Sequence, residues 1–360
     1  SMVLDLPTWS AAPINRERTG LKDFGDCLRG TLFNNDFFLK HRQGKTKFLN
    51  VLQGGNNVDA EIWYDAVKHY PFEGWAMGGN NMKDVDLMLR RLIKLRDEKL
   101  LEPGRDVIHF LGTSKLELAC LLTAVQRNIR EHVNPNMKVT FDCASPFLAT
   151  AYGQVYTQHV HQNDRFSYIM TKAIDNKKLS GSKIAWPWSS PVGERLTMGD
   201  LCYYAPGMLN KLGKEGKTSW DSFAYALMMG HNVECHIVAV QRAQHLMDIE
   251  IAKTRSKINW KHWKKVKSSD MSDEYSDWVP RNILYFNSFV EDLFNTKTKE
   301  EAFEMIDQAI PFLKSLEGAR LQGGPAQNTF SSLFEVEQKQ QTEIDFANPD
   351  DDELNSLIVE

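Results

Sequence analysis

Lys138-Val139-Thr140-Phe141-Asp142-Cys143-Ala144 is an apolar, β-branched run that stops at a carboxylate. A carboxylate at the C-terminal end of a buried strand, directly before a loop, is where barrel enzymes carry catalytic groups. Three earlier strand-like runs also end in unusual residues: Gln53-Gly54-Gly55, Gly78-Gly79 and Gly112-Thr113. Together the four ends predict one active-site rim.

The segments on either side of this run alternate between strand and helix patterns. Apolar strand-like runs lie at 2–4, 47–52, 74–77, 107–111 and 138–141, and from 47 onward they recur roughly every 30 residues. Helical spacing of apolar residues separates them, at 58–70, 83–99 and 115–132, after a first helix near 21–42. This alternation predicts an α/β fold whose parallel strands are joined by right-handed crossovers.

The alternation stops near residue 150. Helical patterns follow over 198–250, clearest over 219–248, and again over 299–317. From Gly318 the chain is polar and Gln-rich, with Asp350-Asp351-Asp352-Glu353 near its end. We therefore predict three parts: strands and rim in residues 1–160, a mainly helical part in 161–317, and a disordered acidic tail in 318–360.

Composition limits the possible settings. The 360 residues carry a formal net charge of −4, so nucleic-acid contact requires a local basic patch. Five scattered cysteines without a CxxC pair predict reduced thiols in a cytoplasmic protein. No apolar run approaches the roughly 18 residues that span a membrane, and no signal peptide is visible.

The strand-end motifs resemble those of the queuine/archaeosine tRNA-guanine transglycosylases. Val51–Gly55, Phe72–Gly79, Phe110–Thr113 and Phe141–Pro146 are similar to the family's VQGG, F-x-G-[YW]-A-[IM]-GG, glycine-turn and FDC-x-x-P motifs, in the same order. Leu4-Asp5 before Pro7 and the pair His231-Asn232 match two further segments of the family. The resemblance covers roughly residues 2–250.

The resemblance implies a (β/α)8 barrel and a covalent base exchange that needs no cofactor. The family's aspartate attacks C1′ of a guanine nucleotide, guanine leaves, and a 7-deazaguanine then displaces the aspartate, as in a double displacement. Asp142 would be this nucleophile. Asp5 and Gln53 would hydrogen-bond the base, and the main chain at Gly78 and Gly79 would approach it.

Three departures from the family change this expectation. Only Cys202 and His231 remain of its zinc site, and two ligands cannot close a tetrahedral site, so we predict no metal. Residues 147–152 hold no arginine where the tRNA enzymes grip the anticodon loop. The family's first three βα units, with a second acidic residue, are absent, so a second chain or a longer form of this chain is expected to complete the barrel.

The missing arginines favour the family's relatives from bacteriophages and bacterial genomic islands, which insert 7-deazaguanines into DNA. The basic, aromatic segment 257–267 is the candidate DNA contact: its lysines would neutralise phosphates, and Trp260 or Trp263 would stack or pack. The lysines concerned are Lys257, Lys261, Lys264 and Lys265.

Plainer interpretations stand beside these predictions. Asp142 could be a helix cap, Gln53 a strand end, the paired glycines a tight turn, and Cys143 a small core residue. At the level of function, three alternatives stay open: a tRNA-guanine transglycosylase, a non-catalytic subunit that binds nucleic acid or a partner, and an unrelated barrel enzyme such as a glycoside hydrolase.

Overall fold

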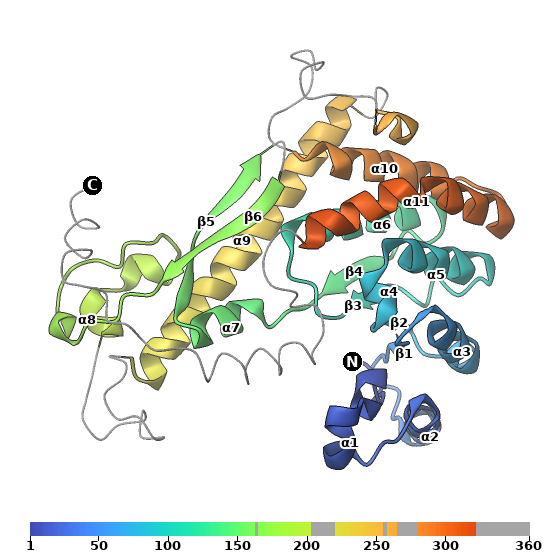
Figure 1. The fold of residues 1–360 in the computed structure, drawn as a ribbon, viewed down its shortest axis with the longest axis horizontal. Helices are drawn as coiled ribbons and strands as arrows, with labels where there is room; N and C mark the ends of the chain where they lie inside the picture. Colours follow the sequence, from blue (N-terminus) through green and yellow to red (C-terminus); the bar gives the residue numbers. More distant parts are fainter. Residues whose placement is uncertain (163–164, 203–219, 255–257, 265–278, 322–360) are drawn as a thin grey trace. The chain divides into compact units, whose positions relative to one another are not determined.

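A parallel sheet lies at the centre of the computed structural model, which describes residues 1–162, 165–202, 220–254, 258–264 and 279–321. Four strands form it in chain order: β1 (Asn50–Leu52), β2 (Gly74–Met77), β3 (Val107–Phe110) and β4 (Lys138–Phe141) (Figure 1). An isolated parallel bridge from Met2 to Leu49 adds the N-terminal segment next to β1. The compact unit that contains the sheet is Ser1–Glu317.

The predicted α/β class and its parallel strands are confirmed. The four strands fall on the predicted runs, and the Met2 bridge falls on the run at 2–4. Within the described residues the parallel sheet has four strands, so closure into an eight-stranded barrel stays a prediction.

The crossovers between strands are helical. The helices are α3 (Asn57–Val67), α4 (Asn80–Lys83), α5 (Val85–Asp97) and α6 (Leu116–His132), close to the predicted bounds. Asn56 begins α3, because its side chain accepts a hydrogen bond from the Asp59 N–H. Leu89, Leu92 and Ile93 of α5 are fully buried in the main core.

The register of the strands sorts side chains to the two faces of the sheet. Asn50 pairs with Trp75, and Trp75 with Ile108, so these three side chains share a face. That face contacts the crossovers: the Trp75 indole N–H donates to Leu100 O at 2.8 Å, after α5. His109 pairs with Thr140 on the opposite face.

The chain before β1 is largely helical and contains the helix predicted near 21–42. It forms a 3-10 turn (Thr8–Ala11), α1 (Pro13–Thr19) and α2 (Phe24–His41). Asp23 caps α2 by accepting from the Asp26 N–H, and Thr31 of α2 receives the Leu6 N–H at 2.9 Å. These contacts fix the segment that carries Asp5.

The chain after β4 contains the long helix α9 (Ser222–Thr254), which runs beside α6 and α7 (Figure 1). The other elements are α7 (Ser145–Ala151), β5 (Gln154–Gln162), β6 (Arg165–Lys172), short 3-10 turns at Lys177–Leu179, Gly193–Arg195 and Trp260–His262, α8 (Met198–Leu201), α10 (Arg281–Phe294) and α11 (Lys299–Leu321). The predicted tail falls almost wholly outside the described residues.

The antiparallel hairpin of β5 and β6 was not predicted, and the expected boundary at 160/161 falls inside β5. Its signal was present in strand-forming residues such as Val155, Tyr156, Phe166 and Tyr168. A register shift between Tyr156 and Gln158 interrupts the period-2 pattern that would otherwise reveal the strand. Helix α10 was also missed.

Over the ranges that the structure describes, no helix has both the length and the apolar character needed to cross a bilayer.

Gly74 tests how tightly β1, β2 and β3 pack. A Cβ there would lie 2.3 Å from Val107 O and 2.7 Å from Leu49 Cδ2. We expect Gly74→Ala to lower the free energy of unfolding by about 2 kcal/mol, because backbone must move. The matched control is Gly230→Ala in α9, where the nearest atom is 3.8 Å away and alanine favours helix. Equal urea midpoints for the two variants would contradict this packing.

Candidate active site

The carboxyl ends of the four parallel strands meet at one edge of the sheet. Leu52, Met77, Phe110 and Phe141 lie side by side in the register. Hydrogen bonds continue past the strands: Gly78 N–H donates to Leu52 O, Leu111 N–H to Met77 O, and Thr113 N–H to Asp142 O, at 2.7–3.1 Å. The residues that follow the strands therefore form one rim, as predicted from their sequence.

Asp142 stands at the β4 end of this rim with its side chain 61% exposed. Its Oδ1 atom accepts from the Gly112 N–H at 3.1 Å and lies 3.2 Å from His109 Nε2. Glycine suits position 112, where φ is +71°. The carboxylate is therefore fastened through one oxygen and open to solvent.

His109 is a site residue that the sequence did not reveal. It lies in the middle of β3, its side chain is 17% exposed, and its Nδ1 is 2.9 Å from Thr140 Oγ1. A histidine inside the apolar run Val107–Leu111 could have drawn attention as a polar residue on a strand that ends at the rim. Its partners, Thr140 on β4 and Asp142 just after β4, are 31 and 33 residues away in sequence.

Asp5 and Gln53 lie together at the β1 end of the rim. Gln53 Nε2 donates to Asp5 Oδ2 at 2.8 Å, and Gln53 is 6% exposed. Burial raises the pKa of the Asp5 carboxyl, although the bond from Gln53 lowers that pKa by a smaller amount. An additional N–H donor to this carboxylate would favour its charged form.

The paired glycines lie against this pair. A Cβ at Gly78 would come within 2.8 Å of Gln53 Nε2, and one at Gly79 within 2.4 Å of Gly54 O. The N–H of Gly78 is already engaged with Leu52 O, which leaves the N–H of Gly79 as the candidate donor to a base. The glycines thus serve close packing as well as turn geometry.

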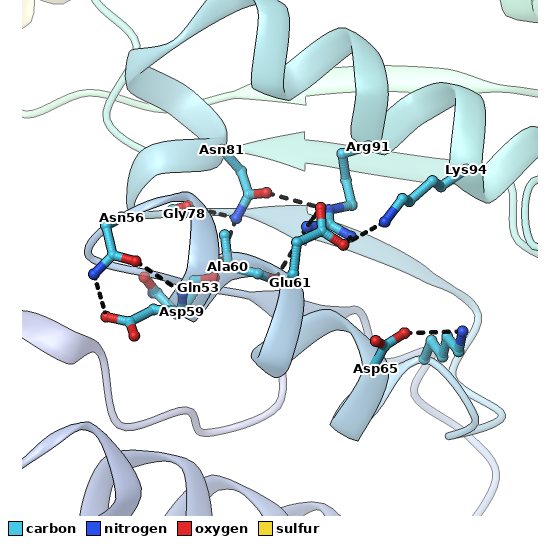
Figure 2. A network of polar contacts seen from close by, with 11 residues as sticks. Gln53, Asn56, Asp59, Ala60, Glu61, Asp65, Gly78, Asn81, Arg91 and Lys94 are labelled. Carbon is cyan, nitrogen blue, oxygen red and sulfur yellow. Dashed lines mark hydrogen bonds and ion pairs between the residues drawn. The ribbon is translucent and has the colours of Figure 1, made fainter. Parts of the chain in front are cut away.

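A buried amide links the loops that follow β1 and β2 (Figure 2). Asn81 Nδ2 donates to Gln53 O at 3.3 Å and to Gly78 O at 3.2 Å. Asn81 Oδ1 in turn lies 3.4 Å from Arg91 Nε. The main chain at Gln53 is therefore held from the helix side as well as by the strand ladder.

Arg91 anchors this network to α3. Its guanidinium, which is fully buried, donates to Ala60 O and to Glu61 at 3.0 Å each (Figure 2). The guanidinium also lies over the Tyr64 ring, 4.1 Å from the ring centroid. Lys94 is a second partner of Glu61. Burial lowers the pKa of Arg91, so the carboxylate is needed to support its charge.

Helix α9 supports the chain just after Asp142. His236 Nε2 lies 3.7 Å from Cys143 Sγ, and its ring stacks on Tyr168 at 4.9 Å. Burial lowers the pKa of His236 to about 4 and raises the pKa of the Cys143 thiol. At neutral pH the pair is a thiol beside a neutral imidazole, which is unlike an activated cysteine nucleophile.

His231 and Asn232 lie inside α9 and organise the hairpin. His231 Nε2 is 2.9 Å from Tyr156 O, and its Nδ1 is 2.7 Å from Ser190 Oγ. Asn232 accepts from the Tyr156 N–H and donates to Thr150 Oγ1. His231 is thus a packed residue with both ring nitrogens engaged.

Cys202 also has a structural place, where its thiol donates to Ile174 O. None of the five cysteines, all of which lie in the described residues, forms a disulfide. No cluster of three or more His, Cys, Asp or Glu side chains suited to a metal occurs in the parts of the chain that the structure describes.

The basic segment is described in part. Lys261 and Lys264 are exposed, whereas Lys257 and Lys265 lie outside the described residues. Trp260 is buried, donates to Asp292 Oδ2 at 2.9 Å and packs edge-on against Phe289. The ring of Trp263 packs against Phe312. Both tryptophans thus pack in the core, and the exposed residues of the described part of this segment include Lys261, Lys264, Asn259 and His262.

Comparison with known proteins identifies no relative: no family model matches the sequence, and no curated protein matches it significantly.

Alanine substitutions at Gly78 and Gly79 are expected to lower the free energy of unfolding by different amounts. In Gly78→Ala the new Cβ meets the side-chain amide of Gln53, which can shift more easily than backbone. We therefore expect the free energy of unfolding to fall by less than about 1 kcal/mol. Gly79→Ala meets the Gly54 carbonyl at a φ of +57°, so we expect about 2 kcal/mol. Urea unfolding of both variants measures the difference, and a larger loss in Gly78→Ala would contradict the geometry.

His236 predicts a loss of stability in acid. The unfolded chain binds a proton at this histidine near pH 6.5, but the folded chain binds it only near pH 4. Between these values the unfolded state holds more protons, so the free energy of unfolding decreases as the pH is lowered. The loss from this group is up to about 3 kcal/mol. Burial lowers the pKa of His231 as well, which adds to the effect.

Urea unfolding at pH 7 and pH 4.5 tests this assignment. His236→Phe keeps the ring stacked on Tyr168 and removes the proton site, so it should flatten the pH dependence. The exposed His245 of α9 supplies the control His245→Gln, which should keep the wild-type slope. An unchanged slope in His236→Phe would show that the acid sensitivity arises elsewhere.

Proposed function

We propose that this chain is a DNA-guanine transglycosylase that exchanges guanine in DNA for a 7-deazaguanine base through a covalent aspartyl-nucleotide. The observation that carries the proposal is the rim itself. It combines an exposed carboxylate held through one oxygen with a partly buried carboxyl–amide pair flanked by two glycines, all at the carboxyl edge of one parallel sheet.

Asp142 supplies the nucleophile in this proposal. A carboxylate oxygen attacks C1′ of the nucleotide while the C1′–N9 bond breaks, and its electron pair leaves with guanine, which takes up a proton. The incoming base then attacks C1′ through N9, and the C1′–oxygen bond to Asp142 breaks. The 61% exposure of the side chain supports access by a nucleotide.

Asp5 and Gln53 supply base recognition. Guanine presents two neighbouring donors, N1–H and the 2-amino group, to a carboxylate, and an acceptor, O6, to an amide N–H. Burial raises the pKa of Asp5, and two N–H donors from a base would stabilise its ionised form. One N–H of the Gln53 amide already holds Asp5, and its second can donate to the base.

The choice of DNA rests on residues 147–152, which contain no arginine, and on the exposed Lys261 and Lys264. These lysines can neutralise phosphates without reading sequence. A guanine inside a duplex must leave the stack before C1′ becomes accessible, so the substrate is single-stranded or flipped.

The test is exchange of labelled guanine into nucleic acid. The full chain, purified under mild conditions from its own cells, is incubated with labelled guanine and either DNA or tRNA. We expect label in DNA, and a loss of about 1,000-fold or more in Asp142→Asn because the amide is not a nucleophile. Asp65→Asn, an exposed aspartate of α3, is the matched control and should keep wild-type activity.

Two outcomes would overturn part of the proposal, and a third would support it against one alternative. Label in tRNA alone would identify a tRNA-guanine transglycosylase. Full exchange by Asp142→Asn would make this chain a non-catalytic subunit. A denaturation-stable nucleotide adduct on Asp142, seen by mass spectrometry, would exclude an unrelated barrel hydrolase.

A further inference from the structure

Both hydrogen bonds that the Asp142 side chain receives from described residues end on the same oxygen. Gly112 N–H and His109 Nε2 lie 3.1 and 3.2 Å from Oδ1. Oδ2 has no partner among the residues that the structure describes. The carboxylate is therefore asymmetric: one oxygen is fixed by the sheet, and the other is left for a reacting atom.

The hydrogen-bond partners define the tautomer of His109. An ionised carboxylate can only accept, so the proton of a neutral imidazole must sit on Nε2, facing Asp142. Nδ1 is then an acceptor, and the hydroxyl of Thr140 donates to it across 2.9 Å. Thr140 thus orients the His109 ring through Nδ1, in the way that an outer hydrogen-bond partner orients a metal-ligating histidine.

Exposure shows which member of the pair supports the other. The Asp142 side chain is 61% exposed and the His109 side chain 17%. A histidine that acts as a base on substrate would be more exposed than its aspartate. Here the histidine is the less exposed of the two, so the carboxylate lies between it and the solvent.

We propose that His109 is a positioning residue for Asp142, with Thr140 holding the imidazole ring through Nδ1, so that Oδ2 is directed toward C1′ of the nucleotide. This inference rests on the proposed base exchange. The physical need is clear, because χ2 of an aspartate is a broad torsion, and an exposed carboxylate without a donor rotates freely. Holding the attacking atom in a near-attack geometry lowers the barrier to reaction.

The test combines graded variants with a separation of kcat from KM. We expect His109→Leu to lower kcat for guanine exchange about 10- to 100-fold, the usual cost of losing an outer partner. His109→Gln, whose Nε2–H can reach Oδ1, should recover part of the loss, and Thr140→Val should lose less than His109→Leu. KM for guanine should not change, because Asp5 and Gln53 lie at the other end of the rim.

Two controls separate positioning from damage to the fold. His245→Gln, on the exposed surface of α9, should keep wild-type kcat and KM. Urea midpoints of the His109 variants identify any loss of folded protein. Wild-type kcat in folded His109→Leu would overturn the inference, as would a change confined to KM or a failure of His109→Gln to exceed His109→Leu.

A spectroscopic measurement keeps this inference distinguishable from the proposed function. Nitrogen-15 NMR of histidine-labelled protein reports the tautomer of His109 without any substrate. The Nε2–H form is expected in the wild type, because Asp142 can only accept, with loss of its preference in Asp142→Ala. An Nδ1–H form would overturn the arrangement even if base exchange occurs, whereas an inactive protein with the Nε2–H form would refute the function instead.

Discussion

The candidate site depends on the parallel register of β1, β2, β3 and β4. The pairing of residues between neighbouring strands determines which residues stand side by side at the strand ends. A slip of one residue would turn every side chain of that strand to the other face. With the observed register, Val51, Ala76, His109 and Thr140 form one row across the sheet, on the face opposite the helices that carry the crossovers. Two residues further along, Gln53, Gly78 and Asp142 continue that face onto the rim.

Packing around the sheet holds this register under both ends of the rim. At the β1 end, the buried Arg91 and its partners Asn81 and Glu61 tie the two loops to α3 and α5. At the β4 end, α9 contributes His236 behind Cys143 and Asn232 between α7 and β5. Groups that must hold reacting atoms in place are best carried by such rigid elements, so the supports and the proposed chemistry are consistent.

Much of the fold was predictable from local patterns. The spacing of Leu89, Leu92 and Ile93 predicted α5, and the β-branched runs predicted strands that the sheet confirms. The hairpin of β5 and β6 was missed because a register shift breaks its alternation. Asp5 and Gln53 were each predicted as site residues, but their contact with one another was seen only in the structure. The Asn81–Arg91 network was not predicted, because an arginine in a sequence is normally taken for a surface residue.

The sequence by itself determined the order of strands and helices and the residue types at the strand ends, because hydrophobic period and glycine position are local properties of the chain. The tertiary structure alone decided that His109 meets Thr140 and Asp142. Those contacts span 31 and 33 residues and arise from the pairing of β3 with β4, which sets both the facing side and the level of each residue. It also decided that Trp260 and Trp263 pack in the core, since their partners come from distant helices.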